Sequence, residues 1–97
     1  MSFKKDNIIL VEIDDLGRLH VKPEITKFIL IWRTATEVHW DPQKETLYSP
    51  KPSDWSYRDW FYYILKVAKE ECNIDLILTE QTRWIKVSSA LKNSILY

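Results

Sequence analysis

The stretch from Trp55 to Tyr63 constrains the fold most strongly, because six of its nine residues are aromatic. Large rings stabilise a protein mainly when they are packed, since fully burying such a side chain is worth about 2–3 kcal/mol. On a helical wheel of about 100° per residue, Trp60 and Phe61 share a face with later apolar residues of the segment 56–72. This periodicity predicts an amphipathic helix whose apolar face covers a sheet.

Polar residues mark both ends of this predicted helix. Ser56 is a suitable N-cap, and Asp59 three residues later completes a pattern that resembles a capping box. Asn73 is suited to the left-handed conformation that ends many helices. The same wheel places Tyr62 on the polar face and Tyr63 at its boundary, so the helix does not use every ring for the core.

Alternation of apolar and polar residues predicts strands on both sides of this helix. Five segments alternate in this way: 7–14, 18–22, 38–41, 46–49 and 74–79. Gly17, the only glycine of the chain, lies between the first two. Because glycine adopts positive φ without steric cost, we expect a hairpin there. On these strands Ile9 and Val11 are expected to face the core, and His20 is expected to point outward.

The stretch 23–36 permits two interpretations. Read as a helix, it places five apolar residues on one face: Ile25, Phe28, Ile29, Trp32 and Ala35. Yet the run F-I-L-I-W (28–32) is unbroken and rich in strand-forming residues. We predict a helix here and keep a strand as the alternative.

These elements predict a single α+β domain over residues 1–97. We expect an antiparallel sheet of about five strands, because hairpins pair consecutive strands. One long helix and one or two short helices, including 87–96, are expected to pack on one face of the sheet. The connector 49–54 contains two prolines but is too short to separate two domains.

Charge and cysteine content argue against several classes of protein. The 14 basic and 14 acidic residues cancel without forming a basic stripe, so we do not expect nucleic-acid binding. Cys72 is the only cysteine, which rules out an internal disulfide and suits a reducing compartment. The apolar run from Ile8 to Val11 is too short for a signal peptide or a membrane span. We therefore expect a cytoplasmic protein without membrane contact.

No catalytic, metal or cofactor motif stands out in the sequence. Two histidines and one cysteine lack the spacing of a zinc site, and one glycine cannot build a phosphate-binding loop. His39 and Asp41 share one face of a predicted strand, and an aspartate can orient a histidine for base chemistry. No nucleophile or second acid accompanies them, so we predict no enzyme. A ligand-binding or hydrolase-like site built on this pair beside Trp40 and Tyr48 is the alternative, and it requires a concave pocket.

A non-enzymatic protein-interaction module is the leading hypothesis. Aromatic residues that the core does not need are typical of interfaces, and acidic residues accompany them here. The expected interaction surface consists of Tyr48, Trp55, Tyr62 and Tyr63, with Trp84 and Asp41 as further candidates. The partner would be another protein, or a second copy in a homodimer. Replacing Trp55 and Tyr62 with alanine should then leave the melting temperature nearly unchanged.

Several strings in the sequence resemble one group of small bacterial proteins. They are G-R-L-H-V-K-P (17–23), V-H-W-D (38–41), L-Y-S-P-K-P (47–52), W-S-Y-R-D-W-F (55–61) and T-R-W (82–84). The group is similar to uncharacterised proteins carried on the mobile gene cassettes of integrons, some of which are similar in size and make-up to toxin-neutralising immunity proteins. This resemblance spans about residues 17–85 and implies a small α+β domain without known catalysis.

Overall fold

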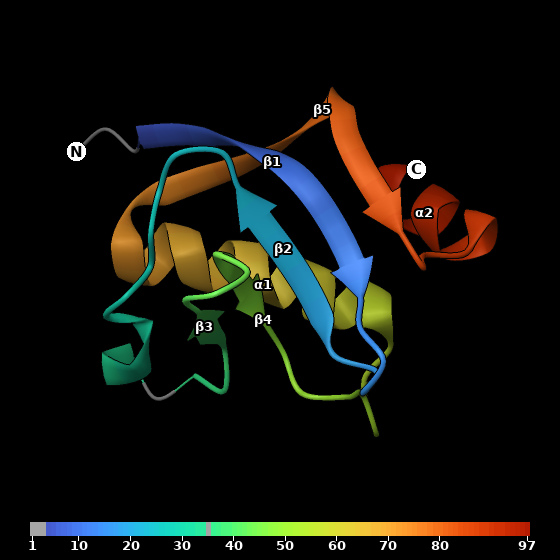
Figure 1. The fold of residues 1–97 in the computed structure, drawn as a ribbon, viewed down its shortest axis with the longest axis horizontal. Helices are drawn as coiled ribbons and strands as arrows, with labels where there is room; N and C mark the ends of the chain where they lie inside the picture. Colours follow the sequence, from blue (N-terminus) through green and yellow to red (C-terminus); the bar gives the residue numbers. More distant parts are fainter. Residues whose placement is uncertain (1–3, 35) are drawn as a thin grey trace.

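A five-stranded sheet with two helices makes up the part of the chain that the computed structural model describes, residues 4–34 and 36–97 (Figure 1). The strands are β1 (Lys4–Ile13), β2 (Leu19–Pro23), β3 (His39–Asp41), β4 (Thr46–Tyr48) and β5 (Ile74–Ile85). The helices are α1 (Tyr57–Cys72) and α2 (Ser89–Leu96), with a 3-10 helix, η1 (Ile31–Thr34), in the segment between β2 and β3. The predicted α+β class and the predicted hairpin at Gly17 are confirmed.

The sheet is mixed, which corrects the prediction of an antiparallel sheet. Its strand order is β3-β4-β2-β1-β5, and the first three neighbouring pairs are antiparallel. β5 pairs with β1 in parallel, from Lys4 opposite Ile74 to Glu12 opposite Ile85. Figure 1 shows why: α1 carries the chain back across the sheet to the end at which β1 begins. Two neighbouring strands that begin at the same end run parallel.

A bulge in β1 changes which isoleucine faces the core. The register of β1 with both neighbouring strands shifts between Ile8 and Leu10. One extra residue in a strand reverses the alternation beyond it, so Ile8 and Val11 are both fully buried. Ile9, the residue predicted to be inside, is only partly buried. Within the irregular stretch, the hydroxyl of Thr82 donates to the carbonyl of Ile8 at 2.5 Å.

The segment between β2 and β3 forms neither the predicted helix nor the alternative strand. The backbone N–H groups of Ile25 and Thr26 donate to the carboxylate of Asp6 on β1, at 3.2 and 2.7 Å. These bonds hold the start of the segment against β1, and tertiary contacts of this kind override local helix preference. Phe28 and Ile31 are buried.

The other apolar side chains of the predicted helix face do not reach the core. Ile25, Ile29 and Trp32 are exposed, and Ala35 lies outside the described residues. Leu30 is exposed as well. The prediction of a helix over 23–36 with a buried apolar face was therefore wrong.

Helix α1 follows the sequence prediction closely. Ser56 and Asp59 form a complete capping box, and Asn73 ends the helix with φ of 59°. Phe61 and Ile64 are fully buried where α1 packs against β2 and β5. Helix α2 packs in turn against α1. This arrangement leaves the start of α1, and the loop that leads into it, at the surface.

Candidate functional site

Three aromatic rings gather at the start of α1. The ring centroid of Trp55 lies 4.9 Å from that of Trp60 and 5.2 Å from that of Tyr63. Trp60 and Tyr63 are one helical turn apart, with centroids 5.6 Å from each other. Trp60 is buried with 8% of its surface exposed, whereas Trp55 keeps 44% exposed. The core therefore holds one side of this cluster, and solvent reaches the other.

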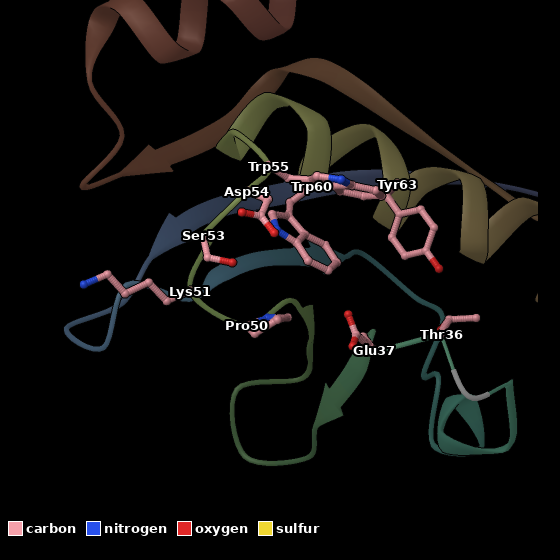
Figure 2. Close-up of a pocket in the computed structure, with 9 residues that line it drawn as sticks. All are labelled: Thr36, Glu37, Pro50, Lys51, Ser53, Asp54, Trp55, Trp60 and Tyr63. Carbon is pink, nitrogen blue, oxygen red and sulfur yellow. The ribbon is translucent and has the colours of Figure 1, made fainter.

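The cluster forms one wall of a hollow of about 710 Å³, which we call the aromatic hollow (Figure 2). Two loops supply the rest of its lining: Thr36 and Glu37 before β3, and Pro50, Lys51, Ser53 and Asp54 before α1. In Figure 2 the carboxylate of Glu37 is directed toward the space beneath Trp60, while the side chain of Lys51 extends away from the rings. The hollow thus combines aromatic surface with acidic groups.

Glu37 and Asp54 bring two free carboxylates to this hollow. Among the described residues neither side chain has a hydrogen bond or an ion pair. Glu37 also has φ of 66°, a left-handed conformation that costs a residue with a Cβ about 1–2 kcal/mol. By contrast, the carboxylate of Asp59 is used inside the protein, because it accepts the backbone N–H of Ser56 at 3.2 Å.

A second hollow of about 620 Å³ adjoins the first, and Trp55 and Tyr63 line both. Tyr62 lines the second hollow, and its hydroxyl donates to the carbonyl of Ile95 at 2.6 Å. The guanidinium of Arg58 lies 5.1 Å from the centre of the Tyr62 ring. Tyr62 therefore lines a surface hollow and also connects α1 to α2 through this hydrogen bond.

Three of the six predicted interaction residues are thus brought together: Trp55, Tyr62 and Tyr63. The expectation that alanine at Trp55 and Tyr62 would leave the melting temperature nearly unchanged does not fit this geometry. Both side chains are more than half covered, with 44% and 43% exposed. Removing them would cost packing as well as any binding.

Tyr48, Asp41 and Trp84 lie outside both hollows. Trp84 on β5 packs against the core, with the ammonium of Lys92 on α2 lying 5.6 Å from its ring. Asp41 accepts the backbone N–H groups of Lys44 and Gln43 at 3.1 and 2.9 Å. Those bonds, that of Lys44 first, lower the pKa of Asp41 against the opposing effect of burial. Asp41 therefore closes the β3–β4 turn.

His20 is fully buried, which corrects the prediction that it points outward. Its Nε2 lies 2.7 Å from the carboxylate of Asp14, and its Nδ1 lies 2.6 Å from the hydroxyl of Thr46. The ring of Tyr48 stacks on it with centroids 5.3 Å apart. Alternation places His20 on the sheet face away from α1, but these three residues cover it there. Thr46 is buried as well.

Electrostatics around Asp14 reflect the same network. Burial by itself would raise the pKa of Asp14, but the hydrogen bonds from His20 and Arg18 outweigh it and hold that pKa well below its usual range. The Nε of Arg18 donates to Asp14 at 2.8 Å. His39, by contrast, is exposed at the sheet edge, and neither His39 nor Asp41 lines a hollow described here. None of these three hollows is therefore the concave pocket that the enzymatic alternative requires.

Two features of the surface differ from the sequence predictions. Glu37 and Asp54 reach the aromatic hollow from loops that no sequence pattern relates to α1, although the prolines of 49–54 indicated an exposed connector. The segment from Ile25 to Trp32 exposes four large apolar side chains: Ile25 at 78%, Ile29 at 62%, Leu30 at 52% and Trp32 at 67%. The mistaken helix assignment concealed this second surface.

Other groups that bear on chemistry are few in the described residues. No helix there is long and apolar enough to cross a membrane. Within the same part of the chain, no three His, Cys, Asp or Glu side chains are grouped so that they could hold a metal ion. Burial, together with the charge of Glu71, raises the pKa of the Cys72 thiol. The thiol is therefore protonated at neutral pH and a weak nucleophile.

Comparisons with known proteins agree with the resemblance noted in the sequence. The family model of the integron cassette protein Hfx_Cass5 matches residues 6–82. The solved structure of integron cassette protein Hfx_Cass5, from the mobile metagenome of the North West Arm sewage outfall, is 36% identical, with a TM-score of 0.52 over 97% of this chain and 94% of that one. No curated protein matches. The chain therefore belongs to the Hfx_Cass5 family of integron cassette proteins.

Proposed function

We propose that the protein is a non-enzymatic interaction module that binds a protein partner through the surface around the two adjoining hollows. The observation that carries the proposal is the position of Trp55, which is 44% exposed and lines both hollows together with Tyr63. Tryptophan and tyrosine dominate the energetics of protein interfaces, above all where they border a pocket. Glu37 and Asp54 supply the acidic part of this surface.

The polar groups elsewhere favour binding over catalysis. His20 and Thr46 are buried and bonded to each other, and Asp14 is engaged with His20 and Arg18. These groups are used to hold the sheet together. The described lining of the aromatic hollow combines the free carboxylates of Glu37 and Asp54 with the hydroxyl of Ser53. It contains no histidine or cysteine, and the side chain of Lys51 extends away from the rings.

Site-specific photo-cross-linking tests the proposal. A photoreactive phenylalanine analogue is introduced at Tyr62 in one variant and at Glu80 in another, because both positions are exposed and Glu80 lies on β5 away from the hollows. After irradiation in cells that carry the gene, we expect the variant at Tyr62 to give a discrete product whose mass exceeds that of the chain. The same product should be missing from the variant at Glu80.

The cross-linked products support or contradict the proposed interaction function as follows. The product at Tyr62 should weaken when Trp55→Ala is combined with it, provided that the variant remains folded. Products that form only from Glu80, or none from Tyr62, would contradict the proposal. A product with twice the mass of the chain would show that the partner is a second copy.

A further inference from the structure

We propose that the aromatic hollow receives the guanidinium group of an arginine side chain presented by the partner, an inference that rests on the interaction function proposed above. Aromatic rings and carboxylates are the two kinds of group that bind organic cations in proteins, and this hollow contains both.

The rings form a corner and do not close on one another. Trp55 and Trp60 are tilted by 48°, and Tyr63 stands at 82° to the first and 79° to the second. Rings at these angles satisfy their own edge-to-face contacts while leaving part of a face open to the hollow. Tryptophan offers the strongest cation–π partner of the three aromatic residues. A flat cation placed in this corner would lie against indole and phenol surfaces.

Negative charge in the hollow is not paired with a cation of the described residues. Within the described residues Glu37 and Asp54 have no hydrogen-bonded or ionic partner. Lys51 is the one basic residue in the lining, and its ammonium extends away from the rings in Figure 2. Its stem is held at the β1–β2 turn instead, where a Cβ added to Gly17 would meet Lys51 Cγ at 3.0 Å. The two unpaired carboxylates therefore favour binding of a cation that belongs to another molecule.

Guanidinium fits this combination better than an ammonium group. It is planar, so it can lie over an aromatic face while its edge donates two parallel hydrogen bonds to a carboxylate. Arginine lies over an aromatic ring three times within the described residues: Arg58 5.1 Å from the Tyr62 ring centre, Arg18 5.0 Å from that of Tyr48 and Arg33 5.4 Å from that of Trp32. Arg18 also donates to a carboxylate, that of Asp14, at 2.8 Å.

The size of the space indicates an arginine within a polypeptide. The hollow of about 710 Å³ is far larger than one guanidinium group, and the adjoining hollow adds about 620 Å³. Volumes in this range accommodate drug-sized ligands or short chain segments. Because Trp55 and Tyr63 line both hollows, residues next to the arginine would find further aromatic surface.

NMR titration of the whole chain with a model peptide tests the inference. The probe is the capped tripeptide acetyl-Gly-Arg-Gly-amide, and the matched control contains citrulline, which keeps the planar shape without the charge. The arginine peptide should shift the indole N–H signals of Trp55 and Trp60 with a Kd on the order of 1 mM, which is the affinity that contacts of one side chain provide. The citrulline peptide should leave both signals in place.

Variants separate the site from general charge effects. Glu37→Gln combined with Asp54→Asn should weaken binding roughly tenfold, since each removes a carboxylate that would pair with the guanidinium. Glu70→Gln combined with Glu80→Gln changes the net charge equally at exposed sites away from the hollow and should not weaken it. Neither pair of carboxylates has an internal partner in the described residues, so all these variants should fold.

Several results would overturn the inference. Equal shifts with the citrulline peptide, or shifts confined to Trp32 or Trp84, would show that no guanidinium site exists at the aromatic hollow. Shifts of the same size with choline chloride would show that the hollow binds organic cations in general, with no preference for guanidinium. If cross-links from Tyr62 identify a partner but the arginine peptide fails, this inference falls and the interaction function stands. Binding of the peptide without any cross-linked partner would instead refute the interaction function.

Discussion

Replacing Asp14 with asparagine probes the buried network on the open face of the sheet. The carboxylate of Asp14 accepts four hydrogen bonds: from the backbone N–H groups of Leu16 and Arg18, from Arg18 Nε and from His20 Nε2. Asparagine removes the charge and offers one oxygen where the carboxylate offers two. One of its amide hydrogens would then face a donor of Arg18 or His20.

The expected loss is large for a domain of this size. Hydrogen bonds to a charged group contribute about 1.5–3 kcal/mol each, and the side chain of Asp14 is only 8% exposed. Since the asparagine can keep some of the four bonds, we expect Asp14→Asn to lower the free energy of unfolding by about 2–4 kcal/mol at pH 7. Each kcal/mol corresponds to about 4–8 °C in the melting temperature of a small domain.

The loss should depend on pH in a defined direction. Because the folded protein lowers the pKa of Asp14, its stabilising effect is complete above the unfolded value of about 3.9 and is lost as the pH falls through the lower folded pKa. Urea unfolding of both proteins, followed by tryptophan fluorescence, should show a constant difference from pH 7 to pH 5 that shrinks on further acidification. Equal stability at pH 7, or a difference that persists unchanged in acid, would refute this description of the network.

Four further substitutions test separate parts of the fold. Tyr62→Phe should cost about 1 kcal/mol by removing its bond to Ile95, with faster hydrogen exchange in α2 as the local readout; unchanged exchange would mean that this bond does not dock the helix. Phe28→Ala should cost about 3–5 kcal/mol, whereas Trp32→Ala should stay within about 0.5 kcal/mol, because one side chain is buried and the other exposed. Similar large losses for both substitutions in chemical unfolding would contradict the structure and favour the predicted helix, which buries both side chains. Gly17→Ala should cost about 1–2 kcal/mol, since φ is 81° at this position; no change in unfolding free energy would exclude strain at the turn.

Local sequence signals predicted the elements that depend on neighbouring residues. The capping box of Ser56 and Asp59, the turn at Gly17 and the left-handed Asn73 are all present. Each of these features is decided within about four residues, where backbone sterics and side-chain capping dominate. Ser88 caps α2 in the same local way, because its side chain accepts the backbone N–H of Leu91.

Features that depend on distant residues were not predicted. The parallel pairing of β5 follows from the path of α1 across the sheet, and the β1 bulge is defined by the register with its neighbours. His20 lies on the polar side of its strand, yet Asp14 and Thr46 close over it. The 23–36 prediction failed because Asp6 supplies hydrogen bonds that no local pattern contains.

The candidate site was predicted in part for the same reason. Helical phase correctly separated buried Trp60 from partly exposed Tyr62 and Tyr63. Glu37 and Asp54 meet the helix only through the fold, since they come from loops on either side of the β3–β4 hairpin. Local patterns therefore indicated the aromatic side chains of the hollow, whereas only the fold brings its two carboxylates to them.

The five tryptophans of the chain permit the most direct test of the central claim. Trp55 and Trp60 report on the aromatic hollow, while Trp32 reports on the exposed apolar segment and Trp84 on the contact with α2. Indole N–H signals recorded with and without the partner captured through Tyr62 should shift at Trp55 and Trp60 and stay in place at Trp32 and Trp84. Shifts at Trp32 with no change at Trp55 would place the interface on the exposed apolar segment from Ile25 to Trp32 and contradict the proposed function.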